Sequence, residues 1–85
     1  MPRVACFTIP GLFCWFWSND HDPPHFQAKR EGESELRALF LQDEPAMFEL
    51  LWGAAPRRKV LHQLVAAVEA HRAELLAEWE ANVNP

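Results

Sequence analysis

The spacing of the apolar residues changes at Pro56, and no other feature of the sequence constrains the fold as much. Before Pro56, short runs rich in aromatic and β-branched residues alternate with turn residues, which is typical of strands. After it, apolar residues recur at intervals of three and four from Leu61 to Trp79, the spacing that places them on one face of a helix. The sequence therefore predicts an α+β fold. We expect an antiparallel sheet of four or five strands in residues 3–52, covered on one face by a helix or helix pair in residues 57–82.

Turn residues divide the first part of the sequence into segments of strand length. Pro10 and Gly11 separate two of these segments, which we predict to form a β-hairpin, and a second turn is expected at Glu31 and Gly32. The predicted strands are residues 3–9, 11–18, 25–31, 35–42 and, as a short fifth strand, 46–52. In the helical region no glycine or proline decides between one helix and two with a bend near residues 70–74.

The two cysteines, Cys6 and Cys14, lie in the two arms of the predicted hairpin. With a three-residue loop they sit opposite each other across the ladder, close enough to touch. No secretory signal pattern opens the sequence, so we expect a cytoplasmic protein with two reduced, buried thiols. The 85 residues are expected to form a single domain, residues 1–85, and the longest apolar run, residues 11–17, is too short to span a membrane as a helix.

The second predicted strand carries large apolar side chains on both faces, because its apolar residues do not alternate with polar ones. A helix covers one face, and a chain of this length has little left to cover the other. We therefore expect the face formed by Phe13, Trp15 and Trp17 to associate with a second copy or to bind a partner protein. The residues assigned to the opposite face are Leu12, Cys14 and Phe16.

The net charge of −4 argues against a nucleic-acid binder that depends on overall charge. Three cations open the predicted helix, where they oppose the helix dipole. We favour their pairing with Asp43, Glu44 or solvent over contact with an anion or nucleic acid. The residues of this candidate basic patch are Lys29, Arg30, Arg57, Arg58 and Lys59, with Arg37 as a further neighbour.

A polar segment with two histidines follows the aromatic run. We favour a structural role for it, as a stiff turn in which the histidines hydrogen-bond to the backbone or to carboxylates. A metal site is the weaker alternative. In an extended Asp22-Pro23-Pro24 segment the backbones of His21 and His25 lie about 12 Å apart, too far to converge on one ion. The residues of this motif are Asn19, Asp20, His21, Pro23, Pro24 and His25.

Position 27 weakens the metal interpretation further. A histidine there would share a strand face with His25 and form a chelating pair, but Gln27 is a poor ligand for such a metal. A four-ligand set remains open, with the two histidines joined either by Cys6 and Cys14 or by Asp20 and Asp22. No nucleophile is evident, so we assign no catalytic residue and no cofactor.

Three motifs of the sequence resemble those of a known family. An Asn-Asp-His-x-Pro-Pro-His-Phe motif after an aromatic strand, a Pro-Arg-Arg helix start and a His-Arg-x-Glu-Leu-Leu-x-x-Trp-Glu helix end are similar to the small bacterial proteins grouped as domain-of-unknown-function family 4160. The matching residues are Asn19, Asp20, His21, Pro23, Pro24, His25, Phe26 and Ala28, then Pro56, Arg57 and Arg58, and finally His71, Arg72, Glu74, Leu75, Leu76, Trp79 and Glu80. The family typically has a third histidine at the position of Gln27. The resemblance implies a small α+β domain, often encoded beside another small gene in pairs that look like toxin–antitoxin or regulatory pairs.

Together these patterns favour a small non-enzymatic module that binds a protein partner or a second copy. The alternative from another class is a metal-dependent or histidine-based enzyme centred on Asp20, His21, Asp22 and His25. A second alternative is accessory nucleic-acid binding through the basic patch.

Overall fold

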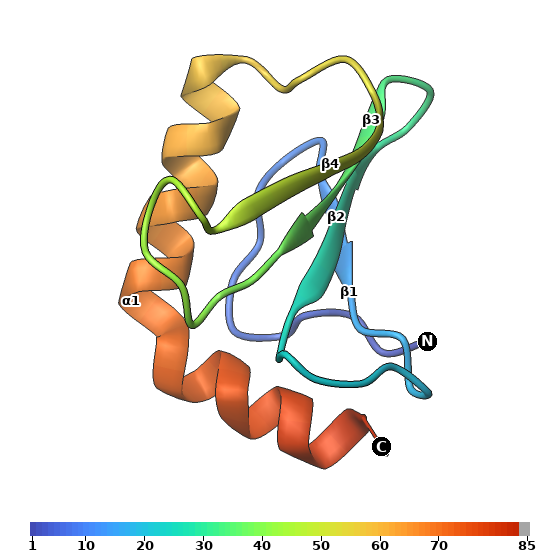
Figure 1. The fold of residues 1–85 in the computed structure, drawn as a ribbon, viewed down its shortest axis with the longest axis vertical. Coiled ribbons are helices and arrows are strands. Elements are labelled where there is room, and N and C mark those ends of the chain that lie inside the picture. Colours follow the sequence, from blue (N-terminus) through green and yellow to red (C-terminus); the bar gives the residue numbers. More distant parts are fainter. Residues whose placement is uncertain (84–85) are drawn as a thin grey trace.

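The computed structural model describes residues 1–83 and confirms the α+β fold. Four antiparallel strands form one sheet in the order of the sequence, and one long helix, α1, lies against one face of this sheet (Figure 1). The elements are β1 (Phe13–Trp15), β2 (Phe26–Arg30), β3 (Ser34–Ala38), β4 (Phe48–Gly53) and α1 (Arg58–Asn82). The fold is therefore an antiparallel meander followed by a helix.

The strand alternation places the core on the face covered by α1. Ala28 of β2 pairs with Cys14 on one side and with Leu36 on the other, and all three side chains are buried. Their neighbours along each strand point to the opposite face, because successive residues of a strand alternate. The fully buried large side chains are Phe16, Phe26, Phe40, Met47, Leu64, Val68 and Leu75.

The helix buries the apolar stripe that the sequence predicts. Leu64, Val68, Leu75 and Trp79 are all buried, and Trp79 contacts the ring of Phe16 with ring centroids 6.4 Å apart. The edge-on arrangement of these two rings, with 66° between their planes, is favourable for aromatic pairs. The helix is thus held to the sheet mainly by apolar contact.

The bend that the sequence left undecided is present, at His71. This residue has φ −129° and ψ 21°, outside the helical range, and the helix changes direction there (Figure 1). Neither glycine nor proline causes the bend. Instead, the ring of Phe7 stacks on the His71 ring and Glu74 lies 2.9 Å from its Nδ1.

The predicted hairpin of residues 3–9 and 11–18 is wrong. Only residues 2–4 run beside β1: the Val4 N–H donates to the Cys14 carbonyl (3.0 Å) and the Phe16 N–H donates to the Pro2 carbonyl (2.8 Å). The chain then leaves the sheet, because the amides of Ala5 and Cys6 donate to the Glu78 carboxylate on α1. Cys6 and Cys14 consequently do not face each other across a ladder, and both are free thiols.

The remaining strands occur where the sequence predicts them, with different ends. The expected strand 35–42 stops at Ala38, since Leu39 instead donates to the carbonyl of Met47 (2.7 Å) and closes a loop. The short fifth candidate is a true strand, β4, and it begins two residues later than expected, at Phe48. No helix within residues 1–83 is both long enough and apolar enough to cross a membrane.

Candidate functional site

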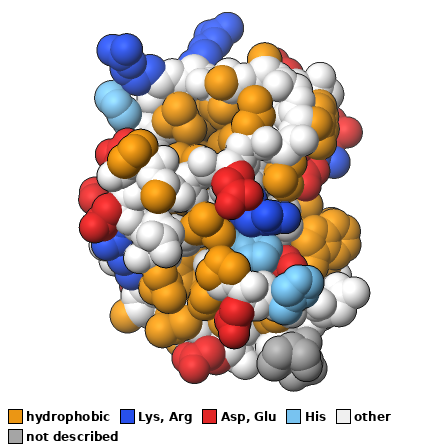
Figure 2. All heavy atoms as spheres, viewed as in Figure 1, with side chains coloured by type: hydrophobic (Ala, Val, Ile, Leu, Met, Phe, Trp, Pro, Cys, Tyr) orange, Lys and Arg blue, Asp and Glu red, His pale blue; other side chains and the backbone are white. Residues whose placement is uncertain are grey.

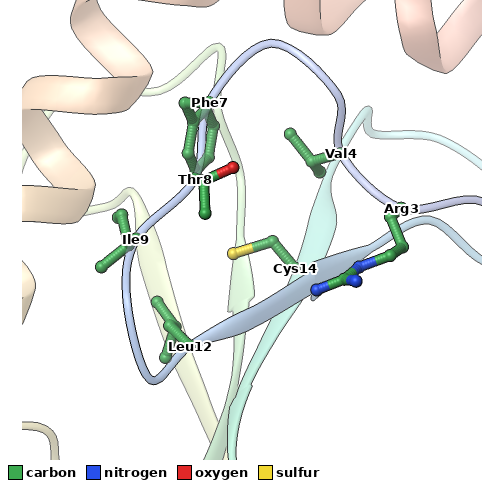
Figure 3. A pocket seen from close by; sticks show the side chains of 7 residues that line it. All are labelled: Arg3, Val4, Phe7, Thr8, Ile9, Leu12 and Cys14. Atoms are coloured by element: carbon green, nitrogen blue, oxygen red, sulfur yellow. The ribbon is translucent and has the colours of Figure 1, made fainter.

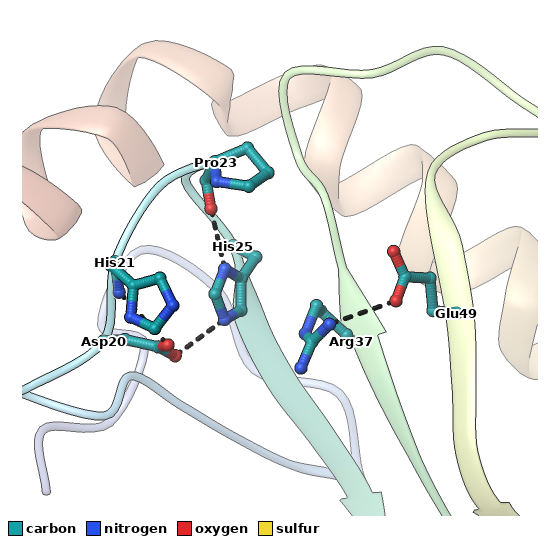
Figure 4. Close-up of polar contacts among 6 residues, drawn as sticks. All are labelled: Asp20, His21, Pro23, His25, Arg37 and Glu49. Carbon is teal, nitrogen blue, oxygen red and sulfur yellow. Dashed lines mark hydrogen bonds and ion pairs between the residues drawn. The ribbon is translucent and has the colours of Figure 1, made fainter.

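The loop between β1 and β2 contains the histidine motif and is tightly constrained. The Asp20 N–H donates to the Trp17 carbonyl (3.1 Å), and the Asp22–Pro23 bond is cis. His25 ends the loop immediately before β2 and is only 4% exposed, whereas His21 is exposed (Figure 4). The motif thus places one histidine inside the protein and one on its surface.

Both ring nitrogens of His25 lie close to polar atoms of the loop itself. Its Nδ1 lies 2.7 Å from the carbonyl oxygen of Pro23, which can only accept, so Nδ1 carries a proton. Its Nε2 lies 2.6 Å from Asp20 Oδ2. That contact is a charge pair when Nε2 is also protonated, although its alignment is not that of a hydrogen bond. His25 therefore ties the two ends of the loop together, with Nδ1 bonded to the backbone and Nε2 beside the Asp20 carboxylate.

The loop borders a small pocket on the face of the sheet opposite α1. The pocket has a volume of about 150 Å³, and it is lined by the two histidines of the motif and by charged side chains of β3 and β4. Figure 4 shows Arg37 directed toward Glu49, whose carboxylate it binds at 3.1 Å. The residues that line the pocket are Asp20, His21, Asp22, Pro23, His25, Arg37, Leu39 and Glu49.

A lateral row of polar side chains crosses the sheet beside this pocket. Trp15 pairs with Gln27, Gln27 with Arg37, and Arg37 with Glu49, so that each strand contributes one residue. Trp15 Nε1, Gln27 Oε1 and Arg37 Nε are buried and have no hydrogen-bond partner among residues 1–83. Gln27 thus lies at the centre of the outer face, a position that sequence reasoning considered only as a missing ligand.

The aromatic residues expected to form an interface lie together on this outer face. The Trp15 ring contacts those of Phe13 and Trp17, with ring centroids 5.2 and 5.8 Å apart, and the Arg3 guanidinium lies 4.5 Å from the Phe13 centroid. Trp15 is only 3% exposed, Phe13 is half-buried, and Trp17 is 42% exposed. The chain's own side chains therefore shield Trp15, whereas Phe13 is partly open and Trp17 is exposed to solvent.

A different apolar surface is open, and the sequence analysis missed it. Leu50, Leu51 and Trp52 of β4 are exposed, and the outer edge of β4 pairs with no other strand of residues 1–83. A groove of about 280 Å³ lies beside this edge, between β4 and the start of α1. Its lining residues are Leu36, Glu44, Pro45, Phe48, Leu50, Ala55, Pro56 and Leu61. The available signal was the pair Leu50-Leu51, because neighbours in a strand cannot both face the core.

Figure 2 shows this arrangement on the molecular surface. Hydrophobic side chains gather over the upper part of the face, in the region of β4 and the first turns of α1. Acidic, basic and histidine side chains lie just below them. The groove and the histidine pocket are thus neighbouring but chemically distinct surfaces.

The candidate basic residues are only partly brought together. Arg30, Arg57 and Lys59 line one shallow pocket near the start of α1, but Arg30 Nε is bound to Glu33 at 3.0 Å. Lys29 is paired elsewhere, with Glu31 at 3.2 Å. Of the partners expected for the helix-start cations, Asp43 binds Arg72 instead, at 3.1 Å. Arg57, Arg58 and Lys59 are exposed, which agrees with the expected alternative of solvent.

Cys14 points into a separate pocket of about 290 Å³ between residues 3–9 and β1 (Figure 3). Burial raises the pKa of the Cys14 thiol to about 12, and the nearby charge of Arg3 lowers it by less. The thiol is therefore protonated at neutral pH and is a poor nucleophile. Cys14 thus supplies no reactive thiolate to this pocket at neutral pH.

The match to a family model agrees with these features. The model described as "Domain of unknown function (DUF4160)" matches residues 11–80. The chain belongs to this family. The matched region contains the histidine loop, all four strands and most of α1, so the β4 groove and the histidine pocket lie within the family domain. Most of the residues that line the Cys14 pocket lie outside it. No curated protein and no solved structure matches the chain.

Proposed function

We propose that this protein is a small, non-enzymatic interaction module that binds an extended segment of a partner protein along β4. The observation that carries the proposal is the open edge of this strand, flanked by exposed apolar side chains and by the groove. Soluble domains normally protect such an edge, because its free N–H and C=O groups pair readily with another chain.

The two edges of the sheet differ in a way that supports this binding mode. At the β1 edge, residues 2–4 of the chain itself lie alongside the strand and satisfy its main-chain groups. At the β4 edge, no segment of residues 1–83 lies alongside the strand or pairs with its outer main-chain groups. An added partner strand would form the same kind of main-chain hydrogen bonds, while the groove receives one of its side chains and provides specificity.

The chemistry of the surface defines the partner segment. The groove is lined mainly by apolar side chains, together with the exposed side chain of Glu44. In a protein of net charge −4, this carboxylate favours an extended apolar segment flanked by Lys or Arg.

A second copy of this chain fits the edge less well. Leu51 forms a β-bulge in β4, because Leu36 pairs with Leu50 and Glu35 pairs with Trp52, which leaves Leu51 without a partner on β3. Two copies that paired symmetrically through β4 would bring both bulges to the centre of the shared ladder, where a bulge interrupts hydrogen bonding. A partner encoded by a neighbouring gene, as the family resemblance implies, is the occupant that we propose.

A peptide-display selection tests this proposal. Ten-residue peptides of random sequence are selected against the intact protein, and the enriched peptides are then titrated in hydrogen-exchange and fluorescence-anisotropy measurements. We expect apolar residues at alternate positions with basic flanks, and slower amide exchange in residues 48–53 on binding.

Two leucines that are equally exposed provide the matched variants. Leu50→Glu places a charge beside the groove and should weaken peptide binding at least roughly tenfold. Leu41→Glu, at a leucine that is also 47% exposed but lies outside the groove, should leave binding unchanged. The proposal is wrong if no peptide is enriched, if both variants behave alike, or if light scattering shows a dimer that Leu50→Glu dissociates.

A further inference from the structure

The N-terminal segment and the bend of α1 bring together three side chains that can bind a metal ion. Cys6, His71 and Glu74 each offer one ligand atom, and these three atoms lie within 4.8 Å of one another. His71 Nδ1 and Glu74 Oε1 are 2.9 Å apart. Ligands around one Zn²⁺ at about 2.0 to 2.3 Å require similar spacing, so small side-chain movements are sufficient to close the site.

The backbone holds these residues in place before any ion binds. His71 and Glu74 are three residues apart on α1 and therefore share a helix face. Cys6 is brought to this face by Glu78, whose two carboxylate oxygens accept the N–H groups of Ala5 (2.7 Å) and Cys6 (3.0 Å). Glu78 is thus a positioning residue.

The site also gathers negative charge. The carboxylates of Glu74 and Glu78 both lie near the Cys6 side chain. A bound divalent ion would offset the negative potential of these two carboxylates. Cys6 and His71 are half-buried and Glu74 is exposed, so an ion can enter from solvent.

We infer that Cys6, His71 and Glu74 form a binding site for a zinc-like divalent metal ion. Sulfur, nitrogen and oxygen ligands together suit Zn²⁺ or Co²⁺ and are unsuited to Mg²⁺ or Ca²⁺. Three protein ligands leave a fourth position open to water. The ion would also join residue 6 to α1 and so stabilise the N-terminal segment, which has no strand of its own.

The inference is independent of the proposed function, because the three ligands share no residue with β4 or its groove. The three ligands also share no residue with the histidine loop between β1 and β2. Failure of either proposal therefore leaves the other standing.

Cobalt titration of the untagged, metal-free protein tests the site. We expect one equivalent of Co²⁺ to produce a thiolate-to-cobalt charge-transfer band in the near ultraviolet, one equivalent of Zn²⁺ to remove it, and Zn²⁺ to raise the unfolding temperature. Cys6→Ser should abolish the band, and Glu74→Gln should weaken Co²⁺ binding roughly tenfold or more.

Matched substitutions on the same helix serve as controls. His62→Ala and Glu69→Gln change an exposed histidine and an exposed carboxylate outside the cluster, and they should leave Co²⁺ affinity unchanged. Glu74→Gln alters an exposed side chain, so it keeps the test decisive if Cys6→Ser does not fold. The inference is overturned if no thiolate band forms, if Cys6→Ser binds Co²⁺ as tightly as the parent protein, or if His25→Ala rather than Cys6→Ser abolishes binding.

Discussion

At the scale of single residues, Cys14 shows how burial alone determines the chemistry of a side chain. Its thiol is 8% exposed and has no carboxylate among the groups that shift its pKa. Cys6 has the same side chain, but it lies beside the carboxylates of Glu78 and Glu74, and its sulfur is within 4.8 Å of ligand atoms of His71 and Glu74. The two thiols were expected to be neighbours, and the structure instead places them in different surroundings.

The raised pKa of Cys14 predicts a specific dependence of stability on pH. Below pH 9 the thiol is protonated in both folded and unfolded chains, so its contribution to stability is complete. Between pH 9 and about 12 the unfolded chain loses this proton first, and stability falls by on the order of 1 kcal/mol per pH unit. Urea unfolding from pH 8 to 11 should show a smaller decline for Cys14→Ala than for the parent protein. An identical decline in both proteins would contradict the assignment.

At the scale of elements, the connections decide how the strands are arranged. The β2–β3 turn contains Gly32 at φ +74°, and β4 ends at Gly53 at φ +84°, both in the left-handed region that favours glycine. The two positions differ in their surroundings. Gly32 lies in open space, whereas a side chain at Gly53 would collide with the Glu33 carbonyl oxygen and would come within 2.7 Å of Ser34 Cα.

This difference predicts unequal costs for the same substitution. Gly32→Ala should lower the free energy of unfolding by about 1 kcal/mol, the cost of the backbone conformation alone. Gly53→Ala should lower it by more than roughly 2 kcal/mol, because the β3–β4 contact must also separate. Urea denaturation measures both values. Equal losses would show that the backbone approach at Gly53 is not close.

At the scale of the whole molecule, one apolar layer holds the helix, the sheet and the loop together. Trp79 is buried where these parts meet. Its ring contacts that of Phe16, next to β1, and its centroid lies 5.3 Å from the centroid of the His25 ring. A domain of 85 residues has a small core and is stable by only a few kcal/mol. The loss of one such contact therefore affects the entire fold.

Two tryptophans provide a test of this dependence. Trp79→Ala should cost about 3 to 5 kcal/mol and leave much of the protein unfolded, as near-ultraviolet circular dichroism and thermal unfolding will show. Trp52→Ala, at a tryptophan that is 46% exposed, should cost far less, since it removes only surface contact and a hydrogen bond to Glu35. Similar losses of unfolding free energy in the two variants would show that Trp79 does not hold the apolar layer together.

The local pattern of residues determined the fold class. The three- and four-residue spacing after Pro56 specifies an amphipathic helix, and the aromatic and β-branched runs between turn residues specify strands, because both signals depend only on neighbours in the chain. The bend near residues 70–74 was left open by the sequence and is present at His71.

Contacts between distant residues decided the rest. Residues 5–9 have a strand-like sequence, yet Glu78, more than seventy positions away, binds their first two amides and draws the segment off the sheet. Tertiary packing likewise buried Trp15, left the β4 edge open and assembled Cys6 with His71 and Glu74. The sequence by itself thus determined which elements form, and only the tertiary structure decided which surfaces they leave available, because hydrogen-bond partners and burial depend on residues that the local pattern cannot contain.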